Sequence, residues 1–405
     1  MQKPEIVVLG KNYSTALGVI RALGREGYPI TLVYVTGKKG GSHIASASRY
    51  VRRTVEQLGR KDGELVERLI ELAGENDGQK VLFPTDDYTA SLIDQHRDAL
   101  AAHYVMPYLE DGGQGSVTRQ MDKMVQIARA EEYGLRAAAT WEIDLRPDEI
   151  VIPDDVVFPC FCKPAVSARG LKREIGMCET REALTEKLYR LQHAMRGRTV
   201  LVQEMLTIEE EYSISGVCLG ETVVLPALLK KLCIAEHEKG VTLLGQVCRF
   251  DSLEYVREQL TGMLSTLGYH GMIDIELIDC GGTIYFNEMN FRNSGVSYGV
   301  TQAGVNLPAM LVRHLTGEAS GAEPSELRYG LRFLYDKAAY EDVLFGDISQ
   351  TAFEEYQRMA DFTMLRDEED PEPERHFLQE MRRKAVKERI KRLAVVRLIR
   401  KITGR

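Results

Sequence analysis

The sequence predicts a mixed α/β (α+β) protein that begins with a parallel sheet. Residues 5–10, EIVVLG, form a short apolar run that ends in glycine, and apolar side chains follow at helical spacing. A second apolar run, PITLVYV, comes next. Strand, helix and strand in this order are the start of an α/β sheet. The 405 residues suffice for two or three domains and a sizeable core.

Composition narrows the class of protein. A hydrophobic content of 44% and a charged content of 28% are ordinary, and the formal net charge of −8 argues against nucleic acid as a partner. The seven cysteines are scattered without C-x-x-C spacing, which indicates reduced thiols in a cytoplasmic protein. The start, MQKPEIVVLG, shows no signal-peptide core, and no apolar run is long enough to span a bilayer.

Residues 1–115 have the pattern of one Rossmann-like domain. KVLFPTDDYTASLIDQH predicts a strand, an acidic turn and a helix, and the glycine-rich DGGQGS predicts the domain boundary. Ligands of such folds bind beyond the carboxyl ends of the strands, here the loop Lys11–Ser14 and the turn with Asp86 and Asp87. GKNYSTALG lacks the dinucleotide fingerprint, which argues against nicotinamide binding.

Polar side chains alternate along two successive predicted strands in MIDIELIDCGGTIYFNEMNFR. Asp274 and Glu276 share one face of the first strand, and Glu288, Asn290 and Arg292 share one face of the second. A hairpin turn at DCGG brings the two faces together. Carboxylate and amide oxygens suit Mg²⁺, and an arginine beside them stabilises a phosphate in transfer. The alternative is an ion-paired sheet edge.

This segment resembles the metal-binding hairpin of the ATP-grasp superfamily, which includes biotin carboxylases and D-alanine–D-alanine ligases. There the pattern is an acid, a short turn and then E-x-N-x-R. The resemblance implies that Glu276 and Glu288 bridge Mg²⁺ ions, for which Mn²⁺ can substitute, and that Asn290 completes the metal site. It also implies a catalytic Arg292 that holds the acyl-phosphate or its tetrahedral successor, with Asp274 as the alternative first acid.

Three further segments resemble nucleotide-binding motifs of the family, in chain order. QMDKMVQIARAEEYGL resembles the helix with the first nucleotide lysine, and FCKPAVSARGL resembles the strand and phosphate loop with the second, which is also implied in catalysis. VQEMLTIEEEYSISG resembles the hinge that binds adenine, with a ribose-binding acid at its end. The implied nucleotide-binding residues are Lys123, Lys163, Ser167, Arg169, Glu204, Met205, Leu206, Thr207 and Glu211.

The phosphate loop departs from the family pattern. PAVSARG contains a single glycine, Gly170, so Ser167 and Arg169 are expected to make contacts that backbone amides make elsewhere. Cys162 lies beside Lys163, but its place in an apolar strand favours a core residue over a nucleophile.

The C-terminal region carries separate signals. RDEEDPEPE (366–374) is acidic and interrupted by proline, which predicts an exposed linker. The last two dozen residues are strongly basic, and an apolar stripe runs through Val386, Ile390, Ala394, Leu398 and Ile402. Such a helix suits an anionic membrane surface. A solvated tail and an oligomerisation helix are the alternatives, and a homodimer is one expected assembly.

The resemblance implies an ATP-grasp fold preceded by a Rossmann-like pre-ATP-grasp domain. The expected units are an N-terminal domain at 1–115, an ATP-grasp domain at 116–320 with a lid at about 140–205, a C-terminal extension at 321–370, and an acidic linker with a basic helix at 371–405.

The implied activity is that of an ATP-dependent carboxylate–amine ligase that forms a C–N bond and releases ADP. The substrates are a small-molecule carboxylate and an amine, such as amino acids or peptides. The segment after residue 340 is similar to the tails of D-aspartate-ligase-like proteins, which favours cell-surface or peptidoglycan ligation at the inner face of the membrane. A carbamoyl-phosphate-type enzyme that activates bicarbonate and a nucleotide-binding regulatory or scaffold protein are the alternatives.

Overall fold

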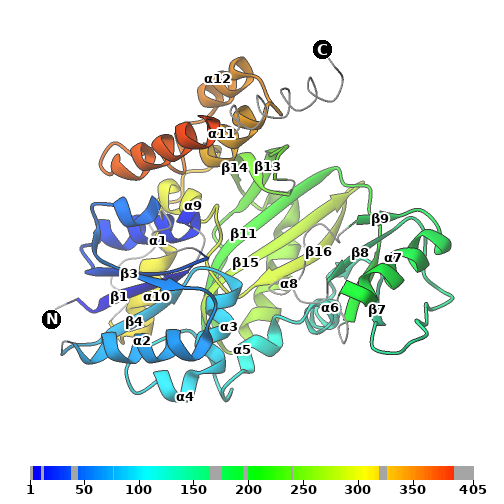
Figure 1. Cartoon of the computed structure of the whole chain (residues 1–405), viewed down its shortest axis with the longest axis horizontal. Helices are drawn as coiled ribbons and strands as arrows, with labels where there is room; N and C mark the ends of the chain where they lie inside the picture. Colours follow the sequence, from blue (N-terminus) through cyan, green and yellow to red (C-terminus); the bar gives the residue numbers. More distant parts are fainter. Residues whose placement is uncertain are drawn as a thin grey trace, which may run out of the picture.

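Three sheet-based parts lie side by side in the computed structural model, with C-terminal helices above two of them (Figure 1). The structure describes residues 3–10, 13–37, 44–75, 77–164, 176–194, 199–238, 240–318 and 326–386. The parts are an N-terminal α/β unit, a large central sheet and a smaller sheet with one covering helix, called the lid below.

The N-terminal unit is a parallel sheet, as the sequence predicts, and its strand order is β3-β2-β1-β4. Its first strand is apolar on both faces because both faces are covered: Ile6 and Val8 pack with α1, and Val7 and Leu9 pack with α2. The elements are β1 (Glu5–Gly10), α1 (Tyr13–Arg25), β2 (Ile30–Thr36), η1 (Ile44–Ala47), β3 (Val51–Leu58), α2 (Asp62–Gly74), β4 (Lys80–Pro84), α3 (Asp87–Gln95) and α4 (Arg97–Leu100).

The acidic turn after β4 is the start of α3. Asp86 caps this helix: its Oδ1 accepts the backbone N–H of Thr89 at 2.9 Å, and its own N–H donates to Thr89 Oγ1 at 3.3 Å. This capping box places Asp87 in the first turn of α3, at the carboxyl end of the sheet.

The lid is an antiparallel sheet with strand order β7-β10-β8-β9. One face of this sheet packs on α7 through a separate apolar cluster that includes Val200, Val202, Leu184 and Leu188. Lys163, in the next position along β8 from buried Cys162, points away from α7. The elements are β7 (Thr140–Asp144), β8 (Cys160–Pro164), β9 (Gly176–Cys178), α7 (Arg181–Ala194) and β10 (Thr199–Glu204).

The central sheet has the strand order β18-β17-β14-β13-β11-β15-β16-β6, with β12 paired to β11 and β5 paired to β15. Its core-facing side packs on α8, which lies behind β11, β15 and β16 in Figure 1. The elements before the C-terminal extension are β5 (Tyr108–Leu109), α5 (Ser116–Gln120), α6 (Lys123–Glu132), β6 (Arg136–Ala137), β11 (Glu210–Leu219), β12 (Thr222–Val224), β13 (Leu228–Ile234), β14 (Thr242–Cys248), η4 (Asp251–Leu253), α8 (Glu254–Ser265), β15 (Tyr269–Cys280), β16 (Thr283–Asn290), α9 (Tyr298–Ala303) and α10 (Leu307–Leu315).

The helix expected over QMDKMVQIARAEEYGL begins only at Lys123, and the residues before it end the separate helix α5. Asp122 interrupts the segment: the side chain accepts the backbone N–H groups of Met124 and Val125 and so caps α6. The interruption places Lys123 in the first turn of α6.

The C-terminal extension completes the central sheet. Its strand β17 pairs with β14, and β18 pairs with β17. The extension consists of β17 (Arg332–Leu334), α11 (Asp336–Phe345), α12 (Gln350–Met359), β18 (Phe362–Thr363) and a helix over residues 372–386.

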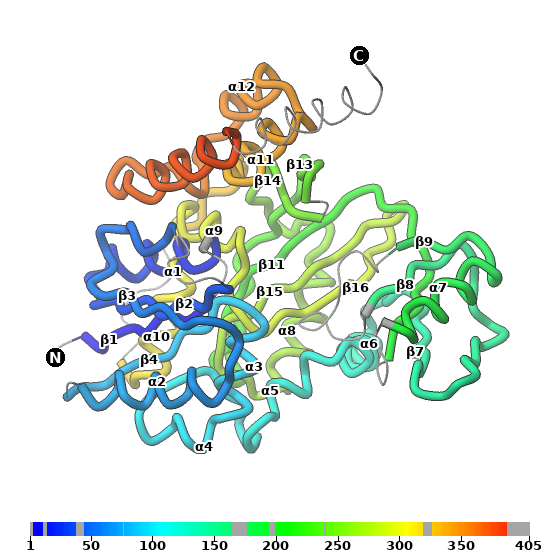
Figure 2. Tube along the Cα trace, viewed as in Figure 1, coloured from blue at the N-terminus to red at the C-terminus, as the bar shows by residue number. Residues whose placement is uncertain are grey.

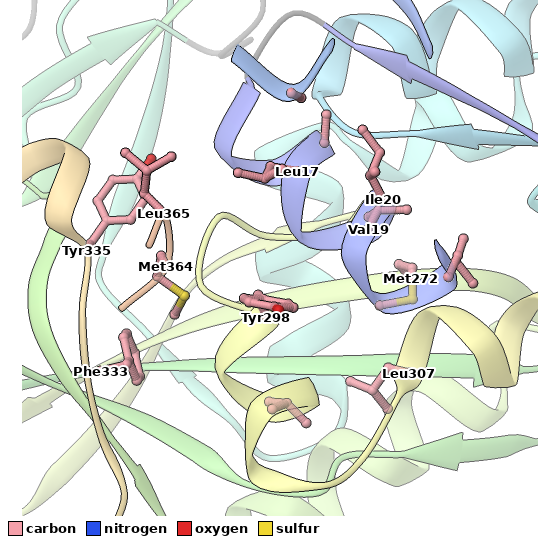
Figure 3. Packing of buried hydrophobic residues seen from close by; sticks show 14 of the residues in the cluster. Leu17, Val19, Ile20, Met272, Tyr298, Leu307, Phe333, Tyr335, Met364 and Leu365 are labelled. Carbon is pink, nitrogen blue, oxygen red and sulfur yellow. The ribbon is translucent and has the colours of Figure 1, made fainter. Parts of the chain in front are cut away.

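One apolar cluster joins the N-terminal unit, the central sheet and the C-terminal extension. Figure 3 shows Ile20 of α1 on the side of Met272 of β15 and Leu307 of α10, and Leu17 of α1 and Phe333 of β17 belong to the same cluster. These parts are therefore stabilised together rather than as independent domains.

The acidic stretch predicted as an exposed linker is instead partly buried and packs against the N-terminal unit. Figure 2 shows the last helix, in red, next to that unit. The guanidinium of Arg21 on α1 donates to Asp370 Oδ2 at 3.0 Å and to the backbone oxygens of Met364 and Leu365 at 3.1 and 2.9 Å. Both charged side chains are fully buried. The prediction failed because the partner of the acidic residues lies about 350 positions earlier.

The described part of the last helix is anchored in the protein. Phe377 and Met381 belong to the shared apolar cluster, whereas Val386 is 59% exposed. The rest of the predicted basic helix, residues 387–405, lies outside the described residues. Within the described ranges, no helix has the length and apolarity needed to cross a membrane.

The buried ion pair leads to a stability prediction. Replacing Arg21 by Met leaves Asp370 charged and without its guanidinium partner in the interior, so the free energy of unfolding should fall by about 3–5 kcal/mol. Urea unfolding followed by circular dichroism measures this. Arg68→Ala, which removes an exposed pair with Glu71, should stay near wild type. Equal effects of the two substitutions would contradict the burial argument.

Candidate functional site

Two carboxylates lie side by side on neighbouring strands of the central sheet. Glu276 on β15 lies directly opposite Glu288 on β16. The register then shifts, so that Asn287 is an extra residue and its Nδ2 donates to Glu276 Oε2 at 3.4 Å. This β-bulge lets Phe286 and Met289 both point into the apolar core while Asn287 and Glu288 point to the opposite face. Simple alternation, as predicted, would have turned Phe286 out of the core.

Asn290 and Arg292 continue this polar face toward the N-terminal unit. Asn290 lies opposite Asp274, and both are almost fully buried. Arg292 follows the end of β16, with its Nη1 3.8 Å from Asp274 Oδ2. Its Nε donates to Asp87 Oδ1 at 2.8 Å. Because Asp87 begins α3, this ion pair connects the hairpin to the N-terminal unit.

Lys123 approaches the paired carboxylates from the start of α6. Its Nζ lies 2.8 Å from Glu288 Oε2. The backbone N–H groups at the N-terminus of a helix add positive potential at the same place, which suits an anionic ligand. The predicted first lysine therefore lies where a phosphate could meet it next to a metal ligand.

Gln126, which the sequence reasoning missed, fixes that approach. Its Nε2 donates to the carbonyl of Met289 at 2.7 Å, and its Oε1 accepts the N–H of Met289 at 3.0 Å. The amide thus acts as a strand partner for β16 beyond its pairing with β6. Gln126 comes one helical turn after Lys123, and this spacing next to a predicted nucleotide lysine is the signal that could have identified it.

Lys163 points from the lid toward the same carboxylates. Its Nζ donates to Gln203 Oε1 at 2.7 Å, and Gln203 Nε2 donates to Thr140 Oγ1 at 2.9 Å. Burial and the charge of Lys123 together lower the pKa of Lys163 to about 8, although Glu288 partly opposes both. This neighbourhood places Lys163 within electrostatic reach of the central sheet.

Cys162, beside Lys163, is a core residue as predicted. Its side chain is fully buried in the apolar cluster of the lid. Burial raises the pKa of its thiol to about 12, which keeps it protonated and unreactive near neutral pH.

Lys231 on β13 belongs to the site. Its Nζ donates to Glu211 Oε2 at 2.5 Å. Burial works to lower the pKa of Lys231, but Glu276 and Glu211 outweigh it and raise the pKa. The predicted ribose ligand Glu211 is thus held by a lysine and shares the sheet face of Glu276.

The two acids of β15 are crowded. Burial raises the pKa of Asp274 to about 7, opposed by Arg292 and reinforced by Glu276. Burial likewise raises the pKa of Glu276, opposed by Lys231 and reinforced by Glu288. Additional positive charge at this place would stabilise both carboxylates.

Glu288 differs from its neighbours. Burial acts to raise its pKa, but Lys123, Lys163 and Arg292 outweigh burial and hold the pKa below its usual range. The side chain is therefore an anion surrounded by cations from three parts of the chain.

The oxygen donors fit a hard divalent cation. Glu276 and Glu288 are adjacent across the hairpin, and the amide of Asn290 lies two residues further along the same face. Among the described residues, no three His, Cys, Asp or Glu side chains form a ready metal cluster. Two carboxylates and an amide are nevertheless the donor set expected when substrate phosphates supply the remaining ligands.

The predicted adenine hinge connects β10 to β11. Glu204 is tied to the segment before the lid: its N–H donates to the carbonyl of Ala139 at 2.8 Å, and its Oε2 accepts the N–H of Ala139 at 3.3 Å. Met205 is exposed, Leu206 is half-buried and Thr207 is exposed. Ser167 and Arg169 of the predicted phosphate loop lie outside the described residues.

Comparison with known proteins gives one curated relative. The chain is 24% identical over 278 residues to the D-aspartate ligase of Enterococcus faecium (strain Aus0004). The match spans 61% of this chain and 62% of that ligase, so the chain covers less than two thirds of the relative's length. No family model matches the chain.

Solved structures show the fold. The L-amino acid ligase from Bacillus licheniformis is similar, with a TM-score of 0.60 and 16% identity, over 82% of this chain and 79% of that chain. So is the biotin carboxylase domain of the Hydrogenobacter thermophilus 2-oxoglutarate carboxylase, with a TM-score of 0.60 and 16% identity, over 82% and 74%. That structure is a dimer with MgADP, ADP and bicarbonate. The predicted ATP-grasp fold with a preceding N-terminal domain is confirmed.

The environment of Lys163 leads to a titration prediction. A lysine with its pKa lowered to about 8 is charged below that pH and loses its proton as pH rises through it. After reductive methylation with ¹³C, the NMR resonance that Lys163→Arg removes should titrate near pH 8. The resonance of Lys187, assigned with Lys187→Arg, serves as the reference lysine. A midpoint above pH 10 for Lys163 would show that the side chain is solvated.

Proposed function

We propose that this chain is an ATP-dependent ligase that activates a carboxylate as an acyl-phosphate and joins it to an amine, with release of ADP and phosphate. The observation that carries the proposal is the facing pair Glu276 and Glu288, with Asn290 beside it and Lys123 and Lys163 directed toward it. An ion-paired sheet edge would not require cations from the lid and from α6.

Nucleotide binding is proposed to use both sides of the site. The hinge residues Glu204, Met205, Leu206 and Thr207 bind adenine, Glu211 binds the ribose, and Lys123, Lys163, Ser167 and Arg169 bind phosphates. Glu276, Glu288 and Asn290 hold Mg²⁺ or Mn²⁺. The bound cation supplies charge neutralisation at the phosphates.

The chemistry follows from a property of carboxylates, which are poor acylating agents because oxide leaves badly. Transfer of the γ-phosphoryl group to a carboxylate oxygen breaks the bond between the β-bridging oxygen and the γ-phosphorus and gives a good leaving group. The amine then attacks the acyl carbon, phosphate leaves and the nitrogen loses a proton. Arg292 and Lys163 stabilise negative charge during these steps, and the remaining residues mainly position the reactants.

Amino acids or peptides are the proposed substrates. The name D-aspartate ligase of the curated relative and the name L-amino acid ligase of the structural neighbour support this class. The tail resemblance supports ligation of cell-surface or peptidoglycan precursors in the cytoplasm. Bicarbonate belongs in any test because the carboxylase domain with a similar fold binds it.

A substrate screen tests the activity. ADP release with Mg–ATP should rise when a carboxylic acid and an amino acid are both present, and mass spectrometry should find their condensation product. Glu288→Gln should lower turnover by about 100-fold or more, since even indirect partners of a metal contribute 10–100-fold. Glu186→Gln on the exposed side of α7, away from the site, should retain wild-type turnover. Full activity of Glu288→Gln would refute the metal assignment, and no acid-dependent turnover would refute the ligase.

Contact of the basic tail with the inner face of the cytoplasmic membrane is a separate proposal. The exposure of Val386, the first residue of the predicted apolar stripe, supports it. The full chain should sediment with liposomes containing phosphatidylserine, and a chain ending at Val386 should not. Truncation must spare Phe377 and Met381, which are part of the core. Equal sedimentation of both chains would show that the tail does not carry the membrane contact. Light scattering of the same samples tests the proposed homodimer.

A further inference from the structure

A cavity of about 500 Å³ opens beside the paired carboxylates, on the side of the N-terminal unit. Ser91 and Gln95 line it from one face of α3, and Met121 and Val125 line it from the segment that begins α6. Its inner end is formed by the last residues of β16. Ligand sites are commonly cavities of this size, about 300–1,000 Å³.

The cavity and the proposed nucleotide site share one wall. Glu288, Asn290 and Lys123 line the cavity, and Asp87, the partner of Arg292, lies at its edge. Among the described residues that line it, none comes from the lid strands or from the hinge. ATP bound between hinge and carboxylates therefore leaves the cavity free.

A carboxylate that attacks the γ-phosphate must lie at this shared wall, next to the proposed metal ligands. The rest of that molecule must extend away from the nucleotide, and the cavity is the space that begins there. Lys123 beside the wall, and Arg292 next to it, provide the positive charge that a carboxylate end requires.

The remainder of the cavity is mainly carbon. Met121 and Val125 contribute apolar surface, and Val125 is 42% exposed. A small polar acid would leave this surface in contact with water. An acid with an extended apolar body would bury this surface. Each added methylene group should then raise the binding affinity about fourfold.

We propose that this cavity binds the organic body of the carboxylate substrate and that it selects acids with a large apolar or aromatic group. The inference rests on the proposed ligase function and adds the substrate class. Val125 acts as a specificity residue, and it takes no part in phosphoryl transfer.

Steady-state kinetics with acetate, butyrate and 3-phenylpropionate as the acids test the inference in the full chain with Mg–ATP. The KM should fall along this series. Val125→Trp fills the cavity from an exposed position and should raise the KM for 3-phenylpropionate about tenfold or more. The KM for acetate and for ATP should change by less than about twofold. Val151→Trp, at a valine of the lid that is 76% exposed, is the matched control and should change none of them.

Ser91→Phe fills the same cavity from α3 and replaces Val125→Trp should the latter fail to fold. A KM that is independent of acid size, or a substitution that affects acetate and 3-phenylpropionate equally, would overturn the inference.

Calorimetric titration of 3-phenylpropionate in the presence of Mg–ADP separates the cavity from the activity. Binding to wild type that Val125→Trp weakens and Val151→Trp does not supports the cavity, even where no acid is turned over and the ligase proposal fails. Binding that is absent in wild type, or that Val125→Trp leaves unchanged, overturns the inference. Acid-dependent turnover in the same protein would still support the ligase proposal.

Discussion

The repulsion among carboxylates on the polar face of the central sheet is the constraint on which the rest of the site depends. Glu276 lies opposite Glu288, and Asp274 lies two residues away in a nearly closed environment. Such a group of anions is stable only with compensating positive charge. The chain supplies it from separate places, including Lys123 on α6 and Lys163 on the lid. The requirement for cations thus links several parts of the fold to one point.

The sequence predicted the central features of this arrangement because they are local. Alternation along a strand identified Glu276 and Glu288, and the order of motifs identified Lys123 and Lys163. The bulge at Asn287 was not predicted, since alternation alone gives Phe286 the wrong face. What the sequence lacked was the competing demand of the apolar core, which takes both Phe286 and Met289.

Long-range partners explain the remaining differences. Gln126 binds a backbone 163 residues away, and Arg292 binds Asp87 over a separation of 205 residues. The acidic residues between 366 and 374 predicted a solvent-exposed linker. Asp370 is instead buried in an ion pair with Arg21, which lies near the opposite end of the chain. Patterns in sequence describe which side chains share a face. They do not show which distant charge will meet that face, so a buried ion pair can resemble a linker.

The lid has an apolar cluster of its own, separate from the cluster that the other parts of the chain share. The N-terminal unit, the central sheet and the C-terminal extension share one apolar cluster, and Arg21 fixes the extension against α1. Asp87 and Arg292 therefore meet at a junction that a shared apolar cluster stabilises. The lid packs around its own apolar cluster, so its strands do not depend on the central sheet for their core. The lid contributes the positive charge of Lys163 near the carboxylates, and burial lowers the pKa of this lysine. A phosphate beside Lys163 would favour the charged form, so anion binding and protonation of this lysine are thermodynamically linked.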